Sequence, residues 1–272
     1  MIGTAIGAGI GGLRDAIARG LVRIGVGPNA LTVMGLLFTL AAGACLALGA
    51  GAGAAWTLRA GALSAYEPNA WATLAGVMLL LCCAGDMLDG AVARVGRKGT
   101  TFGAFLDSTL DRVSDFAIYL GIGFYFLCRG NLTNALLPFV AVFVAQMVSY
   151  TRARAEDLID FKPVGFWQRG ERTVAIIIAA FAHNVPTLLW QQALGPLLTV
   201  WARIDYTRRV AAGRPPAADP RTSGRRLDRL RLWRYPRRTL PHDLVCAVHI
   251  AILLFVRIPP AADPVGQLLG LR

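Results

Sequence analysis

Charged residues are scarce in this sequence, and acidic residues are the scarcest of them. Only 16% of the 272 residues are charged, and 16 Asp and Glu stand against 28 Lys and Arg. Because 55% of the residues are hydrophobic, the chain has too little charge to cover an ordinary soluble domain of this length. We therefore expect an integral membrane protein.

Histidine and cysteine, the usual ligands of zinc and other soft-metal sites, are also rare. The chain has three His and five Cys, and their spacing matches no metal-binding pattern. Three of the cysteines fall in apolar stretches, where free Cys behaves as a small hydrophobic residue. These residues are therefore assigned structural roles: Cys45, Cys82, Cys83, Cys128, Cys246, His183, His242 and His249.

Six apolar stretches are long enough to cross a bilayer. A hydrocarbon core of about 30 Å requires roughly 20 residues of helix. The sequence therefore predicts an all-α membrane domain of six transmembrane helices over residues 28–207. The predicted helices cover about 30–49, 71–93, 105–127, 134–154, 172–190 and 192–207.

The two flanks of this domain differ from it in composition. Residues 1–27 carry apolar residues at helical spacing among arginines and lack the pattern of a secretory signal, so we expect an uncleaved, amphipathic juxtamembrane surface helix. Residues 208–272 are expected to form a cytoplasmic tail, because eleven arginines over 208–238 face only two aspartates. Anionic lipid headgroups, not nucleic acid, are the expected partner of these arginines. Residues 244–256 are apolar but short, which favours a surface-lying segment.

Lys and Arg lie mostly on one side of the predicted bundle. They precede the first span, follow the sixth, and fill the connections between spans two and three and between spans four and five. The opposite connections contain only Arg59 and Arg129. Since cytoplasmic loops of membrane proteins are enriched in Lys and Arg, we expect both termini to be cytoplasmic and the protein to lie in the cell (inner) membrane.

Four aspartates break the apolar pattern within one short segment. Asp86 and Asp89 are three residues apart, and Asp107 and Asp111 are four apart, so each pair lies on one face of a helix. A short polar turn separates the two helices and predicts a tight hairpin that brings the pairs together. Carboxylates beside lipid need positive compensation. Divalent cations are the natural source, because they prefer oxygen ligands.

The spacing of these residues resembles the signature of the CDP-alcohol phosphotransferase family. The resemblance implies a six-span, usually dimeric enzyme that needs Mg²⁺ or Mn²⁺. Such an enzyme moves a phosphatidyl group from CDP-diacylglycerol to an alcohol and releases CMP. By this resemblance Asp86, Asp89 and Asp107 bind metal, while Asp111 joins a second metal site and acts as the general base. The nucleotide would contact the following residues of the motif: Asp86, Asp89, Gly90, Ala93, Arg94 and Gly103.

A second polar cluster lies on the same predicted membrane face. It is similar to the acceptor site of bacterial phosphatidylinositol-phosphate synthases and their archaeal relatives, which bind inositol 1-phosphate. The matching positions are Ser149, Arg152, Arg172 and Arg203. Arginine recognises phosphate through paired hydrogen bonds, so a phosphorylated polyol is the expected acceptor. Inositol 1-phosphate is the first candidate and glycerol 3-phosphate the alternative. The bacterial pattern usually has Lys at Arg152 and Pro at Gly170.

Other interpretations of both clusters remain open from the sequence. The aspartates could form a buried ion-pair network with Arg94, Arg97 and Arg112. The arginines of the second cluster could anchor the helices at the membrane surface. A cation transporter is a further alternative, but the sequence supplies no second acidic layer on the far side. A noncatalytic family member is disfavoured by the intact aspartates.

Overall fold

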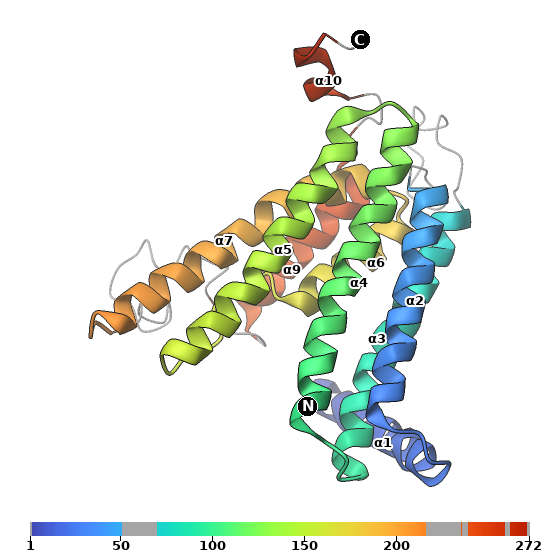
Figure 1. Ribbon diagram of the computed structural model, residues 1–272, viewed down its shortest axis with the longest axis vertical. Helices are drawn as coiled ribbons and strands as arrows, with labels where there is room; N and C mark the ends of the chain where they lie inside the picture. Colours follow the sequence, from blue (N-terminus) through green and yellow to red (C-terminus); the bar gives the residue numbers. More distant parts are fainter. Residues whose placement is uncertain (1, 51–69, 216–234, 236–238, 259–261, 271–272) are drawn as a thin grey trace.

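A computed structural model of the chain describes residues 2–50, 70–215, 235, 239–258 and 262–270, and its regular structure is helical throughout these residues (Figure 1). Residues 51–69, between the first two predicted spans, and most of the predicted arginine-rich tail lie outside the described residues. The helices are α1 (Ile2–Arg23), α2 (Pro28–Leu48), α3 (Ala70–Val95), α4 (Thr101–Cys128), α5 (Leu132–Leu158), α6 (Arg169–Phe181), α7 (Val185–Ala211), α9 (Leu240–Phe255) and α10 (Pro264–Leu268).

Three of the helices, α2, α3 and α5, are long and apolar enough to cross a membrane. The first four predicted spans agree with α2, α3, α4 and α5 to within about four residues at each end. The predicted boundary between the fifth and sixth spans is wrong. The chain turns at residues 182–184, because Pro186 lies in the first turn of α7 and cannot continue the preceding helix. Helix α6 is consequently only 13 residues long.

Small residues allow α2 and α4 to pack at backbone distance. A Cβ atom at Gly43 would lie 2.6 Å from the carbonyl oxygen of Ala117, and one at Gly121 would collide with the Gly43 carbonyl. Close approach at glycine is a common way for membrane helices to associate, since apolar side chains alone give little preference for protein over lipid. The contact holds the α3–α4 hairpin against α2.

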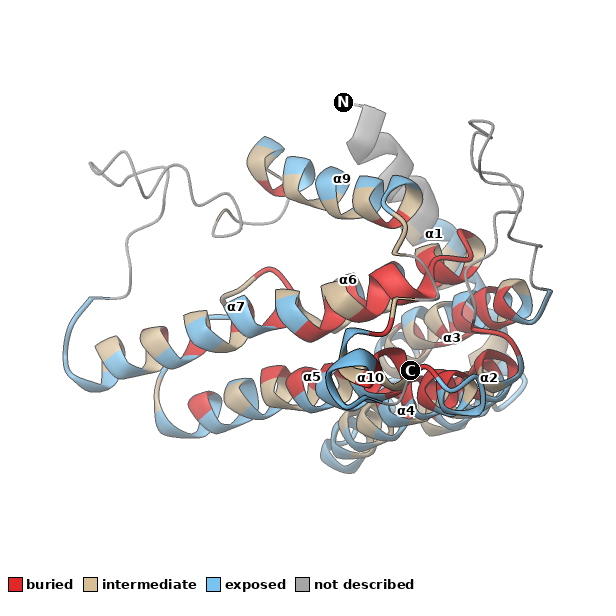
Figure 2. Cartoon of the chain, turned by 90° about the horizontal axis from the view of Figure 1, so that it is seen from above, coloured by how far each residue is buried: buried red, intermediate tan, exposed pale blue. Residues whose placement is uncertain are grey.

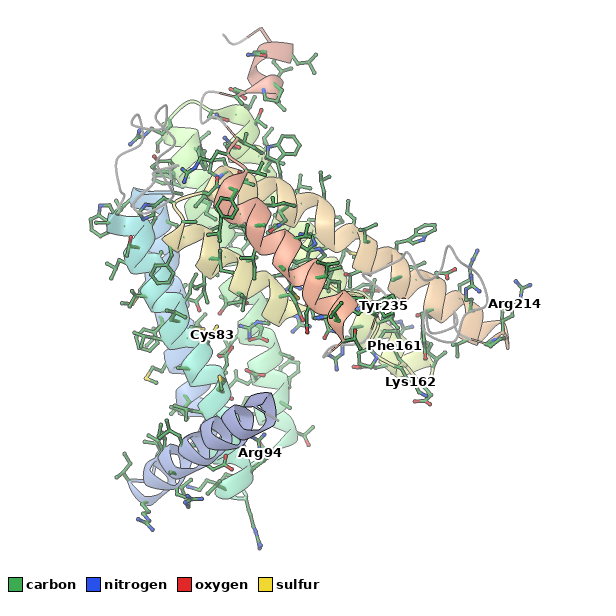
Figure 3. All side chains as sticks on the ribbon, turned by 180° about the vertical axis from the view of Figure 1, so that it is seen from behind. Cys83, Arg94, Phe161, Lys162, Arg214 and Tyr235 are labelled. Atoms are coloured by element: carbon green, nitrogen blue, oxygen red, sulfur yellow. The ribbon has the colours of Figure 1, made fainter. Side chains whose placement is uncertain are left out.

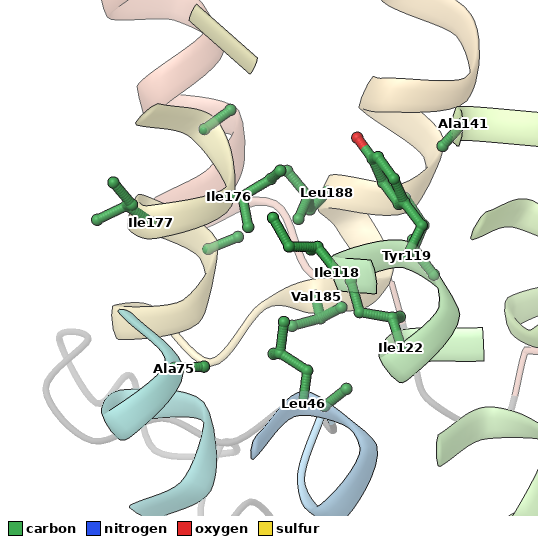
Figure 4. Packing of buried hydrophobic residues seen from close by; sticks show 14 of the residues in the cluster. Leu46, Ala75, Ile118, Tyr119, Ile122, Ala141, Ile176, Ile177, Val185 and Leu188 are labelled. Atoms are coloured by element: carbon green, nitrogen blue, oxygen red, sulfur yellow. The ribbon is translucent and has the colours of Figure 1, made fainter. Parts of the chain in front are cut away.

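The buried side chains form a core where α2, α4, α6 and α7 meet. Figure 4 shows Leu46, Ile118, Ile122, Ile176 and Leu188 facing one another across this core. Figure 2 shows buried residues on the inward faces of the helices and exposed ones on the outward faces. Several of the outward residues are large and apolar, which suits a surface in contact with lipid: Leu37, Leu81, Phe116, Phe124 and Phe143.

Helix α9, which contains the short apolar segment at 244–256, packs against the bundle. Its His249 ring lies against Trp167, with the ring centroids 4.7 Å apart. One turn farther along α9, Leu253 is 1% exposed. The Asn184 side chain donates to the carbonyl oxygens of Leu253 and Val256 at 2.8 and 2.7 Å. The short apolar stretch therefore has a defined place along α6 and α7.

The described C-terminal residues lie at the end of the bundle opposite α1 (Figure 1). Asp263 is 2% exposed and accepts hydrogen bonds from the first backbone amides of α5. Its Oδ1 atom binds the Thr133 amide at 2.8 Å and the Thr133 hydroxyl at 2.7 Å, and its Oδ2 atom binds the Leu132 amide at 3.1 Å. This cap holds the start of α10 at the end of the bundle opposite α1, whereas the sequence predicts both termini on one side of the membrane.

Replacing Asp263 with Ala should lower the Tm in detergent and increase hydrogen exchange at residues 132 and 133, because these two amides at the start of α5 lose their acceptor. Hydrogen bonds from Thr133 hold the pKa of Asp263 well below the usual carboxyl range. The stabilisation should therefore persist at neutral pH and be lost only as the pH falls through that lowered value. Asp243→Ala is the matched control, since its side chain is 71% exposed. Equal effects of the two substitutions would contradict the capping role.

Candidate active site

The turn between α3 and α4 is shaped by hydrogen bonding and close packing. Thr100 caps α4 by accepting from the Gly103 amide at 2.9 Å. A Cβ atom at Gly103 would lie 3.0 Å from Oδ1 of Asn29, at the start of α2. Glycine at position 103 therefore lets the hairpin approach α2, and both aspartate pairs project near this end of the bundle.

The four predicted metal ligands lie at this end of the hairpin, but not all in contact with one another. Oδ2 of Asp86 and Oδ1 of Asp111 are bridged by the guanidinium of Arg169, at 2.7 and 2.8 Å. Asp89 accepts a hydrogen bond from the Thr32 hydroxyl at 3.1 Å. Asp107 lies within electrostatic range of Asp86 and Arg169. The carboxylates are half-buried, so their mutual repulsion is only partly screened by water.

A second ion pair joins α4 and α6 farther into the bundle. Asp115 on α4 accepts from Arg172 on α6 at 2.9 Å, and the Arg172 side chain is 2% exposed. Asp111 and Asp115 are four residues apart, while Arg169 and Arg172 are three apart, so the two pairs form consecutive rungs between α4 and α6. These rungs fix the register of α6 against the carboxylates.

The remaining motif residues line the end of α3. Gly90 is half-buried, and a Cβ atom there would lie 3.5 Å from Nη1 of Arg94. Arg94 is exposed, and Figure 3 places it beside α1. Ala93 is half-buried on the same helix. The guanidinium of Arg94 is thus open to an incoming anion.

The carboxylate oxygens of the four aspartates are suitable ligands for a hard divalent cation, although the carboxylates do not converge on one point. Within the described residues, no three His, Cys, Asp or Glu side chains lie close enough together to hold a metal ion. Arg169 occupies the space between Asp86 and Asp111. One guanidinium cannot neutralise four carboxylates, and carboxylate oxygens are the ligands that Mg²⁺ and Mn²⁺ prefer.

The predicted acceptor residues are brought to one region, but each arginine already has partners. Arg203 lies within electrostatic range of both Arg152 and Arg172. Arg152 pairs with Glu156 at 2.8 Å. Arg203 donates to the carbonyl oxygens of Val148 and Val164. Ser149 is half-buried beside Val148. A pocket of about 200 Å³ between α5 and α7 is lined partly by Arg203, but Ser149, Arg152 and Arg172 are not among its lining residues.

One hydrogen-bond donor among the predicted acceptor-site residues lies inside the protein without a partner in the described part of the chain. Nη1 of Arg172 is buried and makes no hydrogen bond to any described residue, although Nη2 of the same guanidinium pairs with Asp115. A buried cationic donor without an acceptor is costly, so an anion reaching it would gain a strong hydrogen bond.

Two residues that organise the site are not among the predicted site residues. Asp115 continues the four-residue spacing of Asp107 and Asp111, which is a usable signal for a third carboxylate on that face. Arg169 is one of several basic residues in the connection between the predicted fourth and fifth spans. No spacing rule connects it to Asp86, which is 83 residues away.

The fold and the carboxylate cluster together define a class: helical membrane proteins that handle a charged group at one end of the bundle. Residues 26–203 match the family described as CDP-alcohol phosphatidyltransferase. The chain belongs to this family, and the predicted family is confirmed.

Named relatives and solved structures agree with this assignment. The chain is 34% identical to an archaetidylinositol phosphate synthase of Pyrococcus horikoshii over 73% of this chain and 93% of the relative. It is 34% identical to a phosphatidylinositol phosphate synthase of Streptomyces avermitilis over 71% and 76%. It resembles a crystal structure of the Mycobacterium tuberculosis phosphatidylinositol phosphate synthase with CDP-DAG bound. That match has a TM-score of 0.58 and 25% identity, and it covers 71% of this chain and 92% of the other. A second structure of that enzyme, with manganese and citrate, has a TM-score of 0.55 and 25% identity, and covers 70% and 87%.

Replacing Asp115 with Asn should destabilise the protein by about 3–5 kcal/mol, because it leaves the buried Arg172 cation without its counter-ion. The measurement is chemical or thermal unfolding in detergent. Glu156→Gln is the matched control, since its exposed pair with Arg152 should contribute less than about 1 kcal/mol. Unchanged stability of Asp115→Asn would show that Arg172 does not need this partner.

Proposed function

We propose that this protein transfers the phosphatidyl group of CDP-diacylglycerol to inositol 1-phosphate and releases CMP. The observation that carries the proposal is the pair of rungs between α4 and α6. They set Asp111, the proposed base, one helical turn from Asp115 and its partner Arg172, which keeps a free donor for an acceptor phosphate. The names of the relatives, which are inositol phosphate lipid synthases, support the same reaction.

In the proposed reaction the acceptor hydroxyl attacks the phosphorus that carries the diacylglycerol. The bond from this phosphorus to the bridging pyrophosphate oxygen breaks, and CMP leaves with that oxygen. Asp111 takes the hydroxyl proton as the new phosphate ester forms. A bound Mg²⁺ or Mn²⁺, held by Asp86, Asp89, Asp107 and Asp111, would neutralise the phosphate charge. Arg94 and the space beside Gly90, Ala93 and Gly103 are proposed to receive the nucleotide.

The acceptor phosphate is proposed to bind at Arg172 and Ser149, with Arg152 and Arg203 nearby. Arg152 would exchange its exposed pair with Glu156 for the phosphate, at little cost. Arg203 is held by backbone carbonyls, so its contribution would be positive potential and the spacing of α5 and α7. Glycerol 3-phosphate carries the same phosphate and is the alternative acceptor.

The function is tested by CMP release from purified protein in detergent with CDP-diacylglycerol and Mg²⁺ or Mn²⁺. We expect turnover with inositol 1-phosphate that exceeds turnover with glycerol 3-phosphate, and none with unphosphorylated inositol. A preference for glycerol 3-phosphate would replace the proposed acceptor. Ion flux in proteoliposomes without nucleotide, together with no CMP release from any acceptor, would favour the transporter alternative.

Asp111→Asn should lower kcat by at least about 100-fold, because a general base typically contributes 10²–10⁴-fold. Binding of CDP-diacylglycerol should remain measurable, since Asp86 and Asp89 are retained. The matched control is Asp157→Asn on α5, where the exposed carboxylate pairs with Arg154 away from the cluster. A near-normal rate for Asp111→Asn would remove Asp111 as the base.

The proposed orientation puts the aspartates and α1 in the cytoplasm, as the distribution of Lys and Arg favours. Helices α2 to α7 would make six crossings, although α6 is short, and α1 would lie at the surface with Leu13 and Ile17 towards lipid. These two side chains are 65% and 44% exposed. Helix α9 would then make a further crossing, which takes residues 262–268 to the outer face. A homodimer, as the family resemblance implies, would use part of the exposed apolar surface.

This orientation predicts that Leu268→Cys, at a position 85% exposed on α10, reacts with a membrane-impermeant maleimide in intact cells. Lys98→Cys, in the exposed turn between α3 and α4, should react only after the cells are permeabilised. Both substitutions are made with Cys128 replaced by Ser, since Cys128 is exposed near the outer turn. Protection of position 268 in intact cells would contradict a crossing by α9.

A further inference from the structure

Arg169 is the one described cation that directly contacts two residues of the aspartate motif. Its Nη1 atom lies 2.7 Å from Asp86 on α3, and its Nη2 atom lies 2.8 Å from Asp111 on α4. The guanidinium thus joins the two helices of the hairpin through one carboxylate from each motif pair. Charge-assisted hydrogen bonds of this length are among the stronger polar contacts in proteins.

This bridge and a bound divalent cation make conflicting demands on the same oxygens. Mg²⁺ holds its ligands at about 2.0–2.1 Å from a single centre. The guanidinium instead binds Asp86 and Asp111 through different nitrogens, which keeps their oxygens from meeting at one centre. While the bridge exists, these two carboxylates cannot both be drawn to one ion. The bridge also explains why no three carboxylates converge within the described residues.

The Arg169 side chain is held in place mainly by the two carboxylates. Its Nε atom is buried but makes no hydrogen bond to any described residue. The side chain is 30% exposed, so solvent lies beside it. Arg169 is the first residue of α6, so its backbone belongs to the helix while its long side chain is free of the helix interior. The guanidinium can therefore leave the carboxylates without unwinding α6.

We propose that Arg169 is a displaceable internal counter-ion, which holds Asp86 and Asp111 in the metal-free protein and competes with the divalent cation for them. This inference rests on the proposed function only in taking these aspartates as metal ligands. It makes Arg169 a positioning residue: the carboxylates stay gathered without metal, at the expense of metal affinity. Without this bridge the half-buried carboxylates would repel one another and spread the hairpin.

The test is Mn²⁺ binding to purified protein without nucleotide, measured by electron paramagnetic resonance of free Mn²⁺. Arg169→Gln should bind Mn²⁺ about tenfold more tightly, since the competing state is removed. Arg169→Lys should fall between Gln and wild type, because one ammonium cannot bridge two carboxylates as a planar guanidinium does. Arg154→Gln is the matched control, because Arg154 pairs with Asp157 on the exposed face of α5, and it should bind as wild type does.

Thermal unfolding gives a second readout that does not depend on activity. Without metal, Arg169→Gln should have a lower Tm than wild type, and saturating Mn²⁺ should raise its Tm by more than it raises that of wild type. Weaker or unchanged Mn²⁺ binding in both Arg169 variants would overturn the proposal. If Arg169→Gln does not fold, the Mn²⁺ affinity of Arg169→Lys relative to wild type decides the proposal.

The two hypotheses fail in different ways. A wild-type protein that releases no CMP from any acceptor, but follows the predicted order of Mn²⁺ affinities, would remove the proposed reaction and leave the counter-ion role intact. Normal CMP release with unchanged Mn²⁺ affinity in the Arg169 variants would remove the counter-ion role and leave the proposed reaction intact.

Discussion

Repulsion among carboxylates at one end of an apolar helical bundle is the constraint that shapes this molecule. Asp86, Asp89, Asp107 and Asp111 lie on adjacent helices, where water screens their charges poorly. Three of the four carboxylates have a polar partner on a neighbouring helix. Thr32 on α2 donates to Asp89, and Arg169 on α6 bridges Asp86 and Asp111. The four helices around the site are therefore joined by polar contacts at this end and by apolar packing elsewhere.

The short length of α6 is what brings its arginines to the carboxylates. A helix of full bilayer length would carry its first residues to the membrane surface, whereas α6 begins at Arg169, level with Asp86 and Asp111. The segment before it folds inward against α7. The Trp167 amide donates to the Thr199 hydroxyl at 2.9 Å. Gly165 has a φ of +97°, a left-handed conformation that favours glycine, and a side chain there would collide with Thr199. Fold and site are thus coupled through one short helix.

The parts of this protein that could be predicted from sequence are those with local signals. Apolar length located α2 to α5, and the spacing of Asp86, Asp89, Asp107 and Asp111 identified the motif and the family. The boundary between α6 and α7 was misplaced because the apolar pattern continues through the turn, and only Pro186 marks it. The bridge from Arg169 to Asp86 could not be predicted, because it joins residues 83 positions apart and depends on the depth at which α6 begins.

Helix α9 lies outside the matched family region of 26–203, yet it contacts the segments that flank α6 on both sides. Before α6, the His249 ring packs on Trp167. After α6, Asn184 donates to the last turn of α9 and to Val256. These contacts oppose sliding of α6 along its axis, and a shift of one turn, about 5.4 Å, would separate Arg169 and Arg172 from their carboxylates. The C-terminal extension therefore contributes to the site without touching it, by fixing the depth of the helix that carries both arginines.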